Sequence, residues 1–128
     1  MSKEILVVLV LFAIKHLLSD FPLQTVYMLG KGKTGLAWIM PLSAHCAVHA
    51  GLSLPIILFV NPSLFWLVGL EFIAHFVIDR AKVSYKLPQG QWNPQDKGKY
   101  LSKYYFAFGI DQMAHQICYI VMAYFLFQ

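Results

Sequence analysis

The chain has 128 residues, of which 59% are hydrophobic and only 12% charged, and its net charge at pH 7 is +4. Soluble domains carry about 25% charged residues, and a domain this small buries only about two thirds of the surface that its unfolded chain exposes. The composition therefore excludes a soluble enzyme, a disordered chain and a nucleic-acid-binding domain. It predicts a single integral-membrane domain, residues 1–128.

Four stretches approach the roughly 20 mostly apolar residues that are needed to cross the hydrocarbon core of a bilayer. They lack the alternation that is typical of membrane strands, and helices satisfy their own backbone hydrogen bonds in lipid. We therefore expect an all-α fold, a four-helix transmembrane bundle. The predicted spans are, in chain order, residues 4–21, 36–60, 63–79 and 104–127.

The basic residues of the connecting loops predict the orientation of the bundle. Loop 22–35 holds Lys31 and Lys33, loop 80–103 holds six of the lysines and arginines, and the connection at Asn61 holds none. Lysine and arginine are enriched in cytoplasmic loops. We therefore expect both basic loops in the cytoplasm and both termini outside, in a multi-pass protein of the inner (cytoplasmic) membrane.

Each predicted span carries one pair of His or Asp side chains spaced four residues apart. Random placement of these residue types would give on the order of 0.6 such pairs, so one pair in every span is not a chance result. Residues four apart lie on one face of a helix, and in the predicted orientation all pairs fall in the cytoplasmic half, where they can meet. The pairs are His16/Asp20, His45/His49, His75/Asp79 and Asp111/His115.

Ionisable groups at membrane depth cost about 2.5 kcal/mol or more each on insertion scales. They are stable there only if they bind one another, water or a cation. Imidazole and carboxylate together suit a divalent metal, and the four pairs supply more ligands than one tetrahedral zinc ion uses. We predict two metal ions, Zn or Mn, with these eight residues as ligands. A hydrogen-bonded structural network and a proton or ion pathway are the alternatives.

We also predict roles for other polar residues near the pairs. Glu71, or an Asp that binds no metal, is predicted as the general base; for Glu71 the alternatives are a metal ligand or a protonated, hydrogen-bonded side chain. Gln24 and Gln112 are predicted to orient the metal ligands. Arg80 and Lys82 follow the third pair at the level of the lipid headgroups, where they either orient the chain or hold a substrate phosphate.

Lys15 adjoins His16, but successive residues are about 100° apart around a helix. We therefore expect Lys15 to point to another face and to extend toward the membrane interface. Cys46 and Cys118 lie far apart in apolar sequence, and we expect them to be packed thiols.

Four segments resemble, in order, the motifs of a family of small bacterial and phage membrane proteins of unknown function. The family motifs are H-x-x-x-D-F-x-x-Q, H-x-x-x-D and D-Q-x-x-H, and the match covers nearly the whole chain. The segments are HLLSDFPLQ (16–24), His45 with His49, HFVID (75–79) with Lys82, and DQMAH (111–115). The H-x-x-x-D rows are also similar, more loosely, to membrane-bound metal-dependent hydrolases, which implies His16, Asp20, His75 and Asp79 as metal ligands.

The sequence thus predicts a membrane-embedded metal-dependent hydrolase that acts on a lipid-like or phosphorylated substrate through metal-activated water. The expected partners are membrane lipid and an amphiphilic or small-molecule substrate, without nucleic acid, and Gly51 and Gly69 would permit a homo-oligomer. A metal-ion or proton transporter or channel is the first alternative, although the outer halves of the spans are nearly unbroken apolar runs. The second is a non-catalytic structural or holin-like membrane protein, which predicts no bound metal.

Overall fold

The computed structural model describes residues 3–84 and 97–128 and, in this part of the chain, consists of four α-helices without strands. The helices are α1 (Lys3–Asp20), α2 (Ile39–Val60), α3 (Leu67–Ser84) and α4 (Lys97–Leu126). Two short 3₁₀ helices, η1 (Met28–Gly32) and η2 (Pro62–Leu64), precede α2 and α3. The predicted all-α fold with four helices is confirmed.

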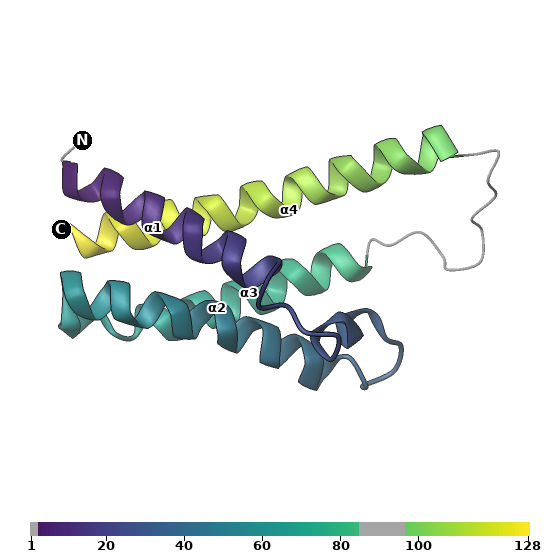
Figure 1. Cartoon of the computed structure of the whole chain (residues 1–128), viewed down its shortest axis with the longest axis horizontal. Coiled ribbons are helices and arrows are strands. Elements are labelled where there is room, and N and C mark those ends of the chain that lie inside the picture. The colour runs from purple at the N-terminus through teal and green to yellow at the C-terminus, as the bar shows by residue number, and fades with distance from the viewer. Residues whose placement is uncertain (1–2, 85–96) are drawn as a thin grey trace.

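The helices form a closed bundle with both termini at the same end (Figure 1). Contacts join α1 to α2, α2 to α3, α3 to α4 and α4 back to α1. At the end away from the termini, η1 packs against the start of α2. A Cβ atom added at Gly30 would lie 3.1 Å from Cγ of Pro41, so the backbone of η1 approaches α2 closely at this position.

The helix boundaries differ from the predicted spans mainly around the predicted loop 80–103. α3 continues to Ser84 and α4 begins at Lys97, so both ends of this loop are helical. The remaining residues, 85–96, lie outside the described residues. Apolar content placed the end of α3 too early and the start of α4 too late, because these terminal turns are polar and basic.

The bundle is polar inside and apolar outside over much of its length. Large hydrophobic side chains are exposed on every helix, for example Leu17, Phe59, Ile73 and Ile120. Histidine, aspartate, glutamate, lysine and serine side chains are buried instead. Soluble domains show the reverse distribution, since burial of apolar surface is what stabilises them in water.

By length and composition, two helical segments of the described residues could cross a membrane, Ile39–Val60 and Pro62–Val83. α1 and α4 do not meet this criterion. Both carry several polar residues among the apolar ones, and many of these point into the bundle, for example Lys15 and His16 of α1 and Asp111 and His115 of α4.

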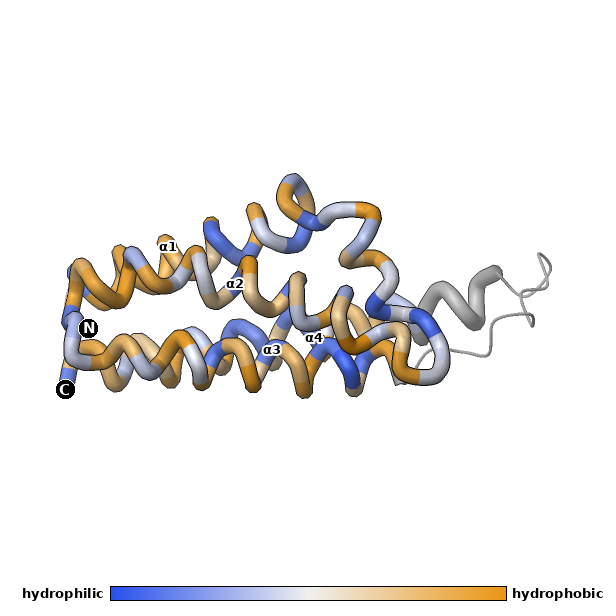
Figure 2. The backbone as a smooth tube through the Cα atoms, turned by 90° about the horizontal axis from the view of Figure 1, so that it is seen from below, coloured by the Kyte–Doolittle hydropathy of each residue, from blue (hydrophilic) through white to orange (hydrophobic). Residues whose placement is uncertain are grey.

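The interior changes character along the bundle axis. Near the termini it is an apolar cluster of Val8, Phe12, Ile57, Leu67, Tyr119, Met122, Ala123 and Leu126. Further along, the same helix faces carry ionisable residues; the buried face of α3, for example, runs from Leu67 through Glu71 and His75 to Asp79 at four-residue intervals. Figure 2 shows hydrophilic residues concentrated in the half of the bundle away from the termini.

Among the described residues, Gly51 and Gly69 mediate no close helix contact. A Cβ atom added at either position would find nothing within 4 Å. Both residues are exposed, so their small size does not serve the packing of the monomer.

Candidate metal centre

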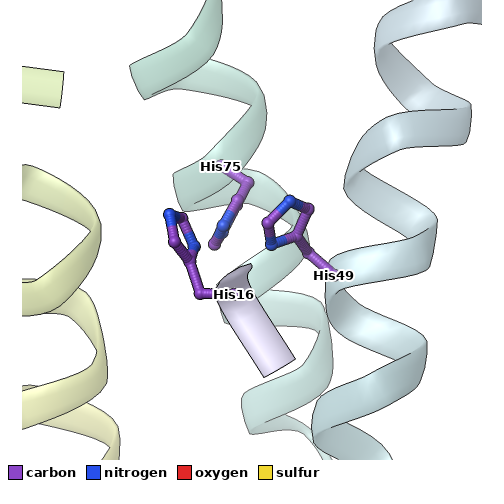
Figure 3. A group of neighbouring side chains, drawn as sticks. All are labelled: His16, His49 and His75. Atoms are coloured by element: carbon purple, nitrogen blue, oxygen red, sulfur yellow. The ribbon is translucent and has the colours of Figure 1, made fainter. Parts of the chain in front are cut away.

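The five histidine rings meet in the bundle interior, although they come from four different helices. The ring centroids of His49 and His75 lie 4.2 Å apart, as do those of His75 and His115. His16 lies 5.1 Å from His49, and His45 lies 4.6 Å from His49. All five side chains are buried, and Figure 3 shows His16, His49 and His75 turned toward one another.

Three aspartates line one side of the histidines. Oδ1 of Asp20 lies 3.1 Å from Nε2 of His49 and 3.4 Å from Nε2 of His45. The two oxygens of Asp79 approach Nε2 of His45 at 3.2 Å and Nε2 of His115 at 3.9 Å. Three groups have ligand atoms within 4.8 Å of one another and could hold a metal ion: His16 with His49 and His75, Asp20 with His45 and His49, and Asp79 with Asp111 and His115. All eight residues that the sequence predicted as ligands are therefore members of one cluster.

Backbone carbonyl groups fix the tautomers that two of the histidines adopt when their rings are neutral. Nδ1 of His75 lies 3.3 Å from the carbonyl oxygen of Glu71, and Nδ1 of His115 lies 2.8 Å from that of Asp111. A carbonyl only accepts, so each Nδ1 donates, and Nε2 keeps its lone pair. Nε2 of His115 is buried without a hydrogen-bond partner among the described residues. A metal ion would satisfy this nitrogen, whose isolation is otherwise costly.

The hydroxyl group of Tyr119 links two of the histidines. It lies 3.0 Å from Nδ1 of His16 and 3.2 Å from Nε2 of His75. Tyr119 is not among the residues predicted from the sequence, because it lies in the apolar half of its span. One signal was available: Tyr119 extends the Asp111–His115 row by another four residues.

The two predicted ligand-orienting amides differ in their contacts. Oε1 of Gln112 lies 3.1 Å from Nε2 of His16. The amide nitrogen of Gln112 donates to Asp20 at 3.3 Å and to Asp111 at 3.2 Å. Gln24 is half-buried beside a cavity and makes no hydrogen bond within the described part of the chain.

Lys15 does not extend toward the interface, and this expectation was wrong. Its ammonium group forms an ion pair with Glu71 and donates to the carbonyl oxygen of His49 at 3.1 Å. The buried face of α1 is wide enough to include both Lys15 and His16, together with Phe12. The outer face of α1 is apolar, so the interior carboxylate of Glu71 is the partner within reach.

Two further lysines pair with aspartates at the end of the bundle away from the termini. Nζ of Lys31, in η1, lies 2.9 Å from Oδ2 of Asp79, and Nζ of Lys82 lies 2.7 Å from Oδ2 of Asp111. In the sequence, Lys31 served only as an indicator of orientation. The guanidinium group of Arg80, by contrast, lies 3.9 Å above the ring of Trp38.

A cavity of about 320 Å³ leads from this end of the bundle to the carboxylates. Its lining combines side chains of the centre and their charged partners with aromatic and aliphatic side chains. The lining residues are Asp20, Phe21, Gln24, Leu29, Lys31, Asp79, Lys82, Val83, Tyr104 and Phe108.

The family described as "Protein of unknown function (DUF3307)" matches residues 8–128, a range that contains every residue of the centre. The chain belongs to the DUF3307 family. No curated protein and no solved structure matches it. Membership in a family of unknown function agrees with the predicted resemblance, so the chemistry of this DUF3307 protein must be argued from the centre itself.

The donor set of the DUF3307 chain fits a divalent metal. Imidazole nitrogens suit Zn and related transition metals, and carboxylates suit Mn as well. The three candidate groups contain no cysteine within the described residues. The chain thus offers mixed nitrogen and oxygen ligands, held by four helices and by a surrounding layer of hydrogen bonds, which is the usual construction of a bundle-core metal site.

Proposed function

We propose that this protein is a membrane-embedded metal-dependent hydrolase that holds two divalent ions, Zn or Mn. The observation that carries the proposal is the convergence of all five histidines and three aspartates on a buried centre in which Nε2 of His115 has no hydrogen-bond partner among the described residues. The ligands are drawn from eight candidate residues, not all of which two ions need: His16, Asp20, His45, His49, His75, Asp79, Asp111 and His115.

The proposal includes four membrane spans, with both termini outside and the cavity facing the cytoplasm. It is supported by the apolar outer surface of the bundle, which extends over α1 and α4 as well as over the two helices that qualify by composition. Lys31 and Lys33, near the cavity, supply the positive charge that is typical of a cytoplasmic loop.

Two metal ions in such a site lower the pKa of a bound water and stabilise the charge that develops on both oxygens of a displacement. The chain must then provide a group that accepts a proton. Asp20 lines the cavity, and its side chain is 19% exposed. Glu71 is fully buried, paired with Lys15, and does not line the cavity. The geometry favours Asp20 as the general base over Glu71, since the eight candidate ligands exceed what two ions with open positions require.

The cavity supports an amphiphilic substrate. Its lining contains charged side chains of Asp20, Lys31, Asp79 and Lys82 together with the aromatic and aliphatic side chains of Phe21, Leu29, Val83, Tyr104 and Phe108. A substrate with one polar and one apolar part would contact both.

The test is elemental analysis of the purified protein beside a His16→Ala/His75→Ala double variant, with Gln116→Ala as an exposed control on α4. We expect about two metal equivalents in the wild type and the control, and loss of metal in the double variant. The metal-loaded proteins are then assayed against lipid phosphates and esters. A wild-type protein that binds no metal, or that binds metal but hydrolyses none of these bonds, contradicts the proposal.

Transport is a second candidate function for the same residues, and the structure supports it less well than hydrolysis. A transporter needs a polar path to both sides, whereas the interior near the termini is the apolar cluster that contains Phe12, Ile57 and Leu67. Ion flux in liposomes that disappears in the double variant would favour transport over hydrolysis.

A further inference from the structure

We propose that Lys31 and Lys82, together with the metal-loaded centre, form a binding site for a phosphomonoester that is attached to an apolar group. The proposal rests on the proposed function and names its substrate class and the residues that recognise it.

Charge balance is the first step. Four carboxylates, those of Asp20, Glu71, Asp79 and Asp111, share the centre and its surroundings with three ammonium groups, those of Lys15, Lys31 and Lys82. With neutral histidines, one negative charge remains. Two divalent cations would convert this into an excess of three positive charges. Uncompensated charge is costly in an interior of low dielectric, so the loaded centre favours an anionic ligand. A phosphomonoester carries about −1.5 to −2 charges at pH 7.

The second step is how the two lysines are connected to the metal ligands. Asp79 presents Oδ2 to Lys31 and Oδ1 to Nε2 of His115, at 2.9 and 3.9 Å. Asp111 presents Oδ2 to Lys82, at 2.7 Å, whereas its Oδ1 is buried without a hydrogen-bond partner among the described residues. Each carboxylate thus has a lysine on one oxygen, while the other is available to a cation. A cation bound there draws negative charge from the carboxylate and weakens its attraction for the lysine.

The position of these ammonium groups is the third step. Lys31 comes from η1 and Lys82 from α3, and both line the cavity. Their side chains are 17% and 28% exposed, so a ligand in the cavity can reach them without unfolding the centre. Lysine binds phosphate as a mobile point charge, which suits a group that changes partner from a carboxylate to a phosphate.

The apolar residues that line the cavity favour a phosphorylated amphiphile over a free phosphate. Phe21, Leu29 and Phe108 lie in the same cavity as the two lysines. Inorganic phosphate would leave these side chains without a partner, whereas an acyl or prenyl chain would cover them and gain about 25 cal/mol per Å² of apolar surface removed from water.

The experiment measures binding to the metal-loaded protein in phosphatidylcholine nanodiscs. The probes are phosphatidic acid, diacylglycerol with the same chains, and inorganic phosphate. We expect phosphatidic acid to bind at least about tenfold more tightly than either other probe, and only when metal is present. Lys31→Gln and Lys82→Gln should each weaken its binding by about tenfold without loss of metal. Lys33→Gln is the matched control, because Lys33 is an exposed lysine beside η1 that does not line the cavity.

The outcomes separate the two proposals. Metal-loaded protein that binds phosphatidic acid and diacylglycerol equally, or lysine variants that bind phosphatidic acid as the wild type does, would overturn the phosphate site and leave the metal centre standing. Inorganic phosphate that binds as tightly as phosphatidic acid would overturn the apolar part of the site. Absence of metal from the wild-type protein overturns the proposed function and this site together. If a Gln variant fails to fold, Lys31→Arg and Lys82→Arg preserve the charge and should retain binding, and the comparison of lipids on the wild type needs no variant.

Discussion

The ammonium group of Lys15 and the carboxylate group of Glu71 form an ion pair between α1 and α3, with side-chain exposures of only 6% and 0%. The pair adjoins the histidine cluster, because Lys15 also donates to the carbonyl oxygen of His49. Removing one member of a buried ion pair leaves an uncompensated charge, while removing both is often nearly neutral. The pair therefore stabilises the contact between α1 and α3 only when both side chains are present.

This asymmetry makes a prediction for stability. Lys15→Met and Glu71→Gln should each lower the free energy of unfolding in detergent by about 3 kcal/mol. The double variant should recover most of that loss. Lys33→Met, at an exposed position, should change little. If the effects of the two single variants simply add in the double variant, the two side chains are not coupled.

Tyr119 is predicted to tune the affinity of the centre without being a ligand. Tyr119→Phe removes the hydroxyl group that contacts His16 and His75 and keeps the packing against Phe12. Such outer contacts to metal ligands are worth about 10- to 100-fold in affinity. Titration of the metal-free protein with Zn²⁺ should show a loss of this size, while Tyr124→Phe, an exposed position on the same helix, should bind as the wild type does. Equal Zn²⁺ affinities of Tyr119→Phe and Tyr124→Phe would show that the hydroxyl group of Tyr119 does not support the centre.

The assignment of the general base predicts different outcomes for two carboxylates. Asp20→Asn should keep the bound metal and lower the rate of hydrolysis by about 100-fold or more, because its side chain lines the cavity. Glu71→Gln should act mainly through stability, since Glu71 faces Lys15. Metal content and rate are measured on the same samples. Loss of metal from Asp20→Asn would make Asp20 a required ligand instead.

The membrane topology can be tested with single cysteines in a Cys46→Ala/Cys118→Ala background. Four spans put Ser63→Cys and Gln128→Cys on the outer side and Lys33→Cys on the cytoplasmic side. A bundle in which only α2 and α3 cross would put Gln128→Cys on the side of Lys33→Cys. A maleimide that does not cross membranes, applied to intact cells and to inverted vesicles, distinguishes these arrangements. Labelling of Gln128→Cys on the same side of the membrane as Lys33→Cys would rule out four spans.

The helices and the membership of the centre could be predicted because both are encoded within single helices. A spacing of four residues fixes a shared face whatever the neighbouring helices do, so the His75/Asp79 and Asp111/His115 pairs could be identified before the fold was known. The apolar residues around them required the opposite faces to be exposed to an apolar medium or to another protein. Helix ends were less certain, because the polar turns at Lys82 and Lys97 resemble loop sequence.

Contacts between helices were decided only by the tertiary structure. Lys15 had no predicted partner, because the sequence does not state that α1 lies opposite Glu71 of α3. The role of Tyr119 depends on two rings from other helices, and that of Lys31 depends on how η1 folds back over Asp79. Helical periodicity specifies which face of each segment turns inward, whereas the rotation and axial shift of one helix against the next come from side-chain packing across the interior, which no single segment contains.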